Sequence, residues 1–201
     1  MMKEYAVFWL ANGFSPLDPT KIDWFSLCSL KDAVMRYQDL KKTGAKTLFP
    51  IINSIVRDSS NEIILRDVLW KAALNAGVDR DDMLLTATET TGSPTDGLAV
   101  ARFAKAYPNI NIEIYATTPE TAAYFEIMYK ATAKRIEKCE LNFFIHASQN
   151  VSQTFQSRLI YNVMRWVTII TNLSDTAFGL WWNVLNFAYS RRLKGFTRTV
   201  K

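Results

Sequence analysis

The sequence contains few of the residues that define several whole classes of protein. Seven glycines and six prolines in 201 residues exclude a collagen-like chain, and 49% hydrophobic residues are too many for a disordered one. Two cysteines, Cys28 and Cys139, and one histidine are too few for a disulfide scaffold or a clustered zinc site. We therefore expect one folded domain with a buried core, two reduced thiols and no metal site.

Short apolar segments that alternate with longer helical segments are the clearest pattern in the chain. The expected strands are residues 5–10, 47–52, 83–87, 111–116 and 141–146. Each is almost continuously hydrophobic, which is typical of strands buried on both faces of a parallel sheet. Pro50 removes a ladder donor, so we expect the second strand to lie at an edge or to be shorter than its apolar run.

Helix-start signals between these strands agree with the same division. The four intervening helices are expected to begin near Ser29, Ser60, Ser93 and Thr118. The last two of these residues each precede a proline, which is a favoured order at a helix start. Four β–α units followed by a fifth strand predict a doubly wound, mostly parallel, five-stranded Rossmann-like α/β core over residues 1–150.

Residues 151–201 predict a helical extension of two helices and no strand. Within it, a run of 25 residues, 166–190, holds one charged side chain, that of Asp175. We expect these helices to pack on the core or on a second copy of the chain as a homodimer. An amphipathic arrangement on a membrane surface is the alternative. A membrane span is disfavoured, because Asn183 and Asn186 would lie inside the bilayer.

Positive charge is concentrated at the C-terminal end. The chain has 24 Lys and Arg against 19 Asp and Glu, and the last twelve residues hold five basic residues and no acid. The rest of the chain is neutral, which makes nucleic acid an unlikely partner. The start of the chain does not resemble an export signal, because Glu4 interrupts its charged region, and we expect a cytoplasmic location.

Small polar residues cluster in the loops after the predicted strands. Ligands of open parallel sheets bind beyond the carboxyl ends of the strands, where the winding direction reverses. The residues that we expect to bind a ligand there are Asn12, Gly13, Ser15, Asn53, Glu89, Thr91, Ser93, Asp96, Thr117 and Thr118. The hydroxyl-rich loop before the third helix favours a polar or anionic ligand, because free backbone amides lie at a helix start, although ordinary helix capping also explains it.

Two titratable residues at strand ends are candidates for acid–base catalysis. They are Glu89, after the third strand, and His146, at the end of the fifth. His146 has an alternative role, which is a hydrogen bond to a neighbouring loop. No Ser/His/Asp order or glycine-rich dinucleotide fingerprint accompanies them, so whether the chain is an enzyme stays open.

Glu89, the hydroxyl loop after it and Asp96 at the next helix start, together with the first strand and its turn, resemble the YdcF/SanA/ElyC family over residues 5–135. These are bacterial Rossmann-like α/β proteins, one branch of which binds S-adenosylmethionine. In the family the same loop carries an acidic residue and a serine, to which Glu89, Thr91, Ser93 and Asp96 are the nearest equivalents. The glycine cluster of the family's first turn is reduced here to Gly13.

Two functions therefore follow as hypotheses. The first is binding of a small molecule, a nucleotide or an S-adenosylmethionine-like ligand implied by the resemblance, over the strand ends. The alternative is an interaction protein, in which the sheet is a scaffold. In that case the aromatic C-terminal helices and basic tail dimerise or contact a membrane surface.

Overall fold

The chain folds as an α/β protein around one parallel sheet. The computed structural model describes residues 3–11, 13–15, 17–58, 60, 62–148 and 155–195, with the backbone alone at 157 and 190–195. The five strands are β1 (Glu4–Trp9), β2 (Lys46–Ser54), β3 (Met83–Thr90), β4 (Asn111–Ala116) and β5 (Phe144–Ala147), in the order β3-β2-β1-β4-β5. All neighbouring pairs are parallel, which confirms the predicted doubly wound Rossmann-like sheet.

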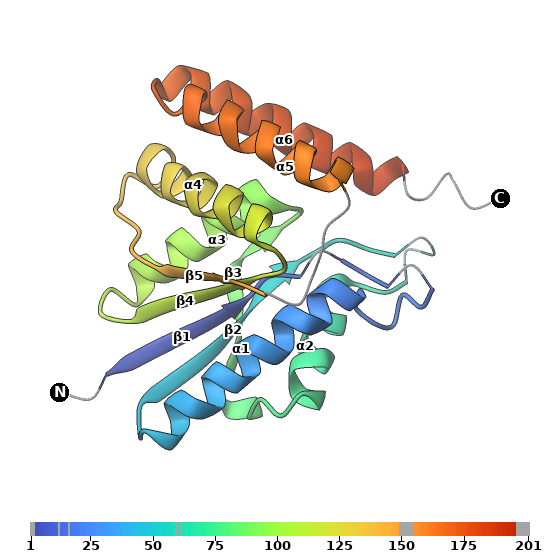
Figure 1. Cartoon of the computed structure of the whole chain (residues 1–201), viewed down its shortest axis with the longest axis vertical. Helices are drawn as coiled ribbons and strands as arrows, with labels where there is room; N and C mark the ends of the chain where they lie inside the picture. Colours follow the sequence, from blue (N-terminus) through green and yellow to red (C-terminus); the bar gives the residue numbers. More distant parts are fainter. Residues whose placement is uncertain are drawn as a thin grey trace.

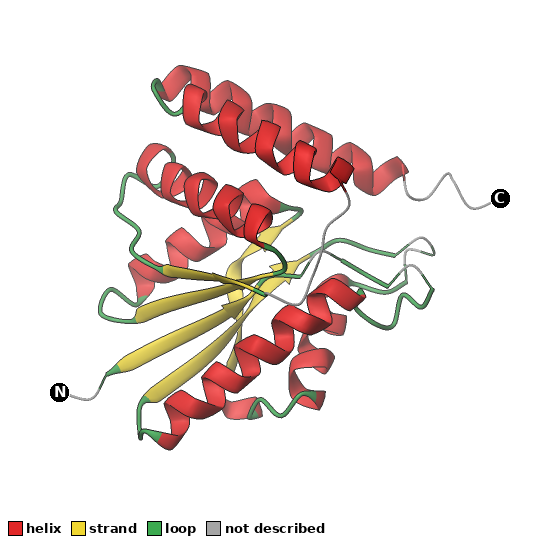
Figure 2. Ribbon diagram, in the orientation of Figure 1, coloured by secondary structure: helices red, strands yellow, loops and turns green. Residues whose placement is uncertain are grey.

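Helices cover the sheet unequally. They are α1 (Trp24–Lys42), α2 (Leu65–Asn75), α3 (Ser93–Ala106), α4 (Pro119–Arg135), α5 (Phe155–Thr171) and α6 (Asp175–Gly195), with a 3-10 turn before β3 (Arg80–Asp82). Figures 1 and 2 show α1 and α2 on one face of the sheet and α3 and α4 on the other. The last two helices, α5 and α6, form a hairpin that contacts α3 and α4, so that face carries a second helical layer.

The central strand β1 shows why both faces of the sheet are apolar. Phe8 packs edge-to-face on Phe103 of α3, with ring centroids 5.0 Å apart. Trp9 points to the opposite face, where its indole N–H donates to the carbonyl of Ser26 in α1 at 3.0 Å. Because successive strand side chains alternate in direction, a strand between two helical layers needs apolar residues at every position.

The expectation for Pro50 was wrong. The second strand, β2, is nine residues long and lies between β1 and β3. Its register with β1 runs only from Lys46 to Leu48, so the chain has left that ladder before the proline. The register with β3 shifts between Ile51 and Asn53, close to the proline. An inner strand tolerates Pro50 here because pairing on the β1 side has ended and a bulge follows.

The two edge strands are not buried on both faces. In β3, Leu85 and Glu89 are exposed on the side of α1 and α2, while Thr86 and Thr90 are buried toward α3. In β5, Phe144 and His146 are exposed on the α1 side, and the strand starts three residues later than predicted. The hydrophobic run 83–87 hid this alternation, because Leu85 is an exposed apolar residue.

The predicted helix starts agree with the structure to different degrees. Helix α1 begins at Trp24, five residues before the predicted Ser29, because Asp23 accepts the Ser26 N–H at 3.0 Å and caps it. Helix α2 begins at Leu65, after Ser60, whose hydroxyl donates to Asp58 instead. The starts of α3 and α4 are confirmed: Ser93 is the first residue of α3, and Thr118 caps α4 by accepting the Thr121 N–H at 3.2 Å.

The α5–α6 hairpin is fixed to the core along its inner side. Phe178 of α6 is fully buried in the cluster of apolar side chains that α3 and α4 form with the sheet. At the hairpin turn, Arg135 of α4 donates to the side-chain oxygen of Asn172 at 3.1 Å and pairs with Asp175. In the described part of the chain no helix is both long and apolar enough to cross a membrane.

Candidate functional site

The strand order places the reversal of winding between β1 and β4. In open parallel sheets a crevice forms at this point, outside the carboxyl ends of the strands. Small residues with polar or backbone groups among those that follow β1, β4 and β5 there are Gly13, Thr117, Thr118 and Ser148. The structure therefore brings three of the predicted ligand-binding residues, Gly13, Thr117 and Thr118, to neighbouring strand ends. We call these four residues the switch-point group.

Two members of the switch-point group have features that suit a ligand. Gly13 has a φ of +151°, and no described heavy atom lies within 4 Å of the place that a Cβ would take. The hydroxyl of Ser148 is buried, and among the described residues no group hydrogen-bonds with it. Buried hydroxyls are almost always paired, so a ligand in the crevice is one group that could bond with it.

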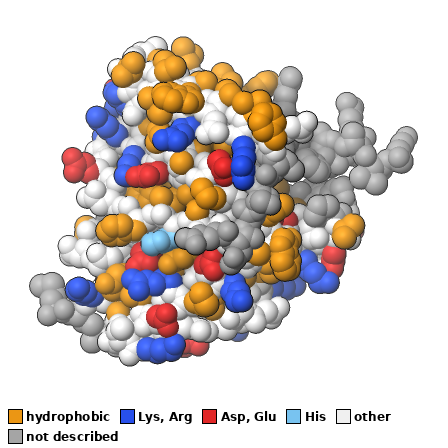
Figure 3. Space-filling model, viewed as in Figure 1, with side chains coloured by type: hydrophobic (Ala, Val, Ile, Leu, Met, Phe, Trp, Pro, Cys, Tyr) orange, Lys and Arg blue, Asp and Glu red, His pale blue; other side chains and the backbone are white. Residues whose placement is uncertain are grey.

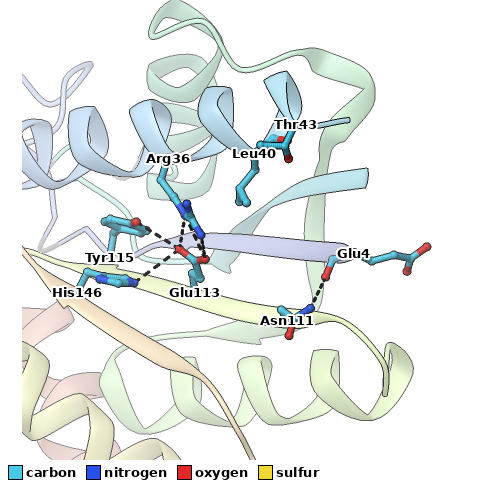
Figure 4. Close-up of polar contacts among 8 residues, drawn as sticks. All are labelled: Glu4, Arg36, Leu40, Thr43, Asn111, Glu113, Tyr115 and His146. Carbon is cyan, nitrogen blue, oxygen red and sulfur yellow. Dashed lines mark hydrogen bonds and ion pairs between the residues drawn. The ribbon is translucent and has the colours of Figure 1, made fainter. Parts of the chain in front are cut away.

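Four polar residues lie next to this group, on the α1 side of β4 and β5 (Figure 4). Arg36 of α1 donates to both carboxylate oxygens of Glu113 in β4, at 2.7 to 3.1 Å. The Tyr115 hydroxyl donates to the same carboxylate at 3.4 Å, and His146 Nε2 lies 3.6 Å from it. We call these residues the β4–β5 polar cluster.

Charge in the β4–β5 polar cluster is balanced around a buried carboxylate. The Glu113 side chain is only 7% exposed, whereas that of Arg36 is 41% exposed. A hydrogen-bonded ion pair with Glu113 raises the pKa of Arg36. Burial and the adjacent Glu113 carboxylate raise the pKa of Tyr115, which therefore stays neutral. The bidentate pair fixes the buried Glu113 side chain in place.

His146 is the member of the β4–β5 polar cluster that a ligand can reach. Its side chain is 46% exposed and its ring stacks on Tyr115, with centroids 4.8 Å apart. Figure 3 shows the one histidine of the chain at the surface, with acidic and basic side chains beside it. Histidine is the side chain that enzymes use most often for proton transfer, and the Glu113 carboxylate is placed to orient the His146 ring.

The other predicted catalytic residue, Glu89, lies elsewhere. It is exposed at the end of β3 and pairs in register with Asn53 of β2, whose side-chain oxygen accepts from Arg66 at 3.1 Å. Since β3 and β5 are the opposite edges of the sheet, Glu89 and His146 are about 19 Å apart, four strand spacings. The two do not form one acid–base pair, and Asn53 lies with Glu89.

The hydroxyl loop after β3 is covered by α6 rather than open. Tyr189 packs so closely on Gly92 that a Cβ there would lie 2.5 Å from its ring. The hydroxyls of Tyr189 and Ser93 are 3.0 Å apart. Thr91 donates its backbone N–H to the Thr95 hydroxyl at 2.9 Å, so that part of the loop caps α3. Ser93 thus contacts the α5–α6 hairpin, and Thr91 contributes to the cap of α3.

Asp96, one turn into α3, lies beneath the same hairpin. Burial raises the pKa of its carboxyl to about 6. The hydroxyls of Tyr124 and Tyr129 in α4 interact electrostatically with this carboxyl, and neither hydroxyl has a hydrogen-bond partner among the described residues. Asp96 is therefore part of a buried polar layer between α3, α4 and α6.

The remaining predicted ligand residues are less informative. Ser15 lies in the loop after β1, where its backbone N–H donates to the backbone carbonyl of Lys21 at 2.8 Å. Asn12 falls outside the described residues. The predicted set is therefore divided between the switch-point group in the middle of the sheet and the residues at the β3 edge, at least two strand spacings away.

Sequence analysis missed Arg36, Glu113 and Tyr115 as site residues. A signal for one of them was present: Glu113 is a lone charge in the apolar strand Asn111–Ala116. A carboxylate at such a position is almost never buried without a partner, so it predicts a basic side chain nearby. The partner, Arg36, is 77 residues away in the chain, and only the fold identifies it.

Comparisons with known proteins do not extend these observations. No family model, no curated protein and no solved structure matches the chain. The resemblance to the YdcF/SanA/ElyC family therefore stays a prediction. Within the described ranges, no group of three or more His, Cys, Asp or Glu side chains is arranged to hold a metal ion.

Proposed function

We propose that this chain binds a small polar ligand of the nucleoside class, a nucleotide or an S-adenosylmethionine-like molecule, at the crevice between β1 and β4. The observation that carries the proposal is the buried, unpaired hydroxyl of Ser148 beside the topological switch point. A ligand hydroxyl or ring nitrogen bonded to it would remove an unfavourable unpaired group.

Three further features support a ligand of this kind. Gly13 allows close approach to the backbone after β1, and Thr118 marks the start of α4, where the helix dipole favours a negative or electron-rich group. The exposed His146 ring, which stacks on the buried Tyr115 ring, offers a flat surface at the end of β5. A planar base can stack on such a surface.

The β4–β5 polar cluster adds a candidate chemical role for one residue. In a ligand complex that extends over β5, His146 would exchange a proton with the ligand, and Glu113 would position it. Arg36 occupies both Glu113 oxygens, so Glu113 is a poor proton acceptor itself. We do not extend this role to Glu89, which lies at the other edge of the sheet.

Calorimetry and thermal unfolding of the full chain with ATP, NAD, adenosine and S-adenosylmethionine test the proposal. At a ligand concentration about 100 times Kd, we expect an increase in Tm of about 5–10 °C for at least one compound. The proposal is refuted if none of the four compounds, at millimolar concentration, gives a heat of binding or a change in Tm.

A single substitution separates ligand binding from a structural role. We expect Ser148→Ala to weaken binding about tenfold, because one hydrogen bond to the ligand is lost, while the ligand-free chain becomes no less stable. The matched control is Thr88→Ala in β3, whose hydroxyl accepts from Arg102 at the far edge of the sheet. That control should leave the affinity unchanged.

A further inference from the structure

Helix α5 has two apolar faces, and only one of them packs on the core. Its inner face carries Tyr161 and Met164, which contact the core cluster, and the fully buried Thr168. Its outer face carries a stripe at helical spacing in which every side chain is more than half exposed. The stripe consists of Phe155, Leu159, Val163, Trp166 and Ile170, and Leu173 continues it beyond the end of the helix.

Helix α6 repeats this arrangement. Phe178 and Leu185 are buried toward α3 and α4, whereas Leu180, Val184 and Phe187 are more than half exposed at i, i+4 and i+7. Figure 3 shows apolar side chains gathered along the top of the molecule, over α5 and α6. We call the exposed residues of both helices the outer apolar face. Exposed apolar surface of this extent on a folded chain marks an interaction site.

The outer apolar face is not needed to hold the hairpin on the core. Contacts of the inner side already do so: Phe178 is buried, Arg135 fixes the turn, and Tyr189 packs on Gly92. The two helices are also joined to each other, because Trp181 Nε1 donates to Thr168 Oγ1 at 2.9 Å. The outer apolar face is therefore available to contact a partner surface.

Charge identifies the kind of surface that fits. Residues 155–201 contain seven Lys and Arg and a single acid, Asp175, whereas the preceding residues contain 17 basic and 18 acidic side chains. Asp175 is itself paired with Arg135 and Lys138. In α5 the charged side chains are Arg165 and Arg158, and Arg158 Nε lies 3.3 Å from a carboxylate oxygen of Glu120 in α4; both arginines are exposed and outside the apolar stripe. By sequence, the chain from residue 155 onward is thus a basic segment, and its hairpin has an apolar outer face.

A second copy of the chain fits this segment poorly. A two-fold dimer joins the same patch on both subunits, so it would bring two basic hairpins together. An anionic bilayer instead attracts the basic residues and takes up apolar side chains at its interface, where Trp is favoured. We propose that the outer apolar face docks on an anionic lipid bilayer, with α5 and α6 lying in the plane of the interface.

Flotation of the full chain with lipid vesicles tests this proposal. We expect binding to vesicles of mixed phosphatidylcholine and phosphatidylglycerol to be at least about tenfold tighter than to phosphatidylcholine alone. Binding should weaken as salt is raised, because the attraction between basic residues and lipid is screened. No binding to the mixed vesicles, or equal binding to both kinds, would overturn the proposal.

Two variants separate the outer apolar face from the rest of the surface. Trp166→Glu places a charge in the middle of the stripe, and we expect it to weaken vesicle binding at least about tenfold. The matched control is Met35→Glu, an exposed apolar residue on α1 at the other side of the molecule. It should bind as the unchanged chain does. Circular dichroism and the unfolding midpoint establish that both variants are folded.

Sedimentation without lipid tests whether the outer apolar face joins two copies of the chain instead. If the chain forms a concentration-dependent dimer that Trp166→Glu abolishes, the outer apolar face is an interface between copies and the lipid proposal is wrong. A monomer that floats with anionic vesicles and loses this property in Trp166→Glu supports it. The test does not depend on the crevice between β1 and β4, so failure of ligand binding leaves it intact.

Discussion

The two faces of the sheet differ most at β4 and β5. On one face, α4 packs on β5 and then carries α5 and α6 as an additional layer. On the other face, α1 covers β4, and the side chains of Phe144 and His146 in β5 remain exposed. Figure 1 shows the hairpin above α4, on the side opposite α1. One face is therefore covered twice, while the other leaves an edge strand open.

This difference explains where exposed chemistry is found. The open side of β5 keeps a polar cluster within reach of solvent, because no described helix seals His146 beneath it. The doubly covered side buries polar groups, such as Asp96 and the hydroxyls of Tyr124 and Tyr129, and displays an apolar surface instead. An exposed polar cluster and an exposed apolar surface thus occupy opposite sides of the same chain.

Removing the main apolar contact of the hairpin should give the largest effect on stability. Phe178 is 0% exposed, so Phe178→Ala leaves a cavity between α6 and the core, and we expect a loss of about 3–5 kcal/mol of unfolding free energy. Urea denaturation measures it. Phe187→Ala on the same helix, at a residue 58% exposed, is the matched control and should change stability by less than about 1 kcal/mol.

A comparable loss from both substitutions would mean that the outer side of α6 also packs on the core. A small loss from both would mean that the hairpin is not part of the cooperative unit. Either outcome would remove the contrast between an inner face that stabilises the chain and an outer face that contributes little to its stability.

On the open face, the ion pair in the β4–β5 polar cluster should have the next largest effect. Arg36→Met keeps the apolar stem but leaves the buried Glu113 carboxylate without its partner. We expect a loss of about 2–3 kcal/mol, below the value for a fully buried pair, because Arg36 is partly exposed. Denaturant unfolding of Arg36→Met at neutral pH gives this value.

Arg102→Met is the control for this ion pair. Arg102 also pairs with a carboxylate, that of Glu137, but Lys105 contacts the same carboxylate and the basic side chains are about half exposed. The expected loss is less than about 1 kcal/mol. Equal losses in the two variants would show that Glu113 is better solvated than its burial indicates.

Much of the sheet could be predicted from the sequence, because its central strands have a local signal. The apolar runs that became β1 and β4 lie in the middle of the sheet, where both faces are covered, so hydrophobicity alone identified them. The edge strands were predicted less well, since β5 starts later than its apolar run and β3 is exposed on one face. Strand order determines which strands are edges, and it depends on pairing between distant segments.

The candidate site was only partly predictable for the same reason. Residues after β1 and β4 could be chosen from the general position of ligands in such folds, which gave Gly13, Thr117 and Thr118. Predicting the Glu113–Arg36 pair requires knowing that α1 crosses β4. Predicting that Ser93 contacts Tyr189 instead of a ligand requires knowing the position of α6. Neither of these contacts leaves a local pattern in the sequence.

On the doubly covered face, the smallest of the expected effects depends on pH. The pKa of Asp96 is about 6 in the folded chain, raised by burial from its ordinary value of 3.8. Between these values the folded state binds more protons than the unfolded state, so stability falls as pH rises from about 4 to about 6. Asp96→Asn removes the charge that burial disfavours. We expect it to stabilise the chain by about 2 kcal/mol above pH 7, and by little below pH 4.

Urea midpoints of both proteins measured from pH 3.5 to 8 give this difference as a curve. Asp67→Asn in α2, where the carboxylate is mostly exposed, is the control for replacing a carboxylate by an amide. A gain for Asp96→Asn that does not vary with pH would mean that the amide stabilises the chain through a new hydrogen bond. A loss above pH 7 would mean that a bound cation or water compensates the carboxylate under α6. In that case the buried polar layer would stabilise the hairpin rather than weaken its attachment.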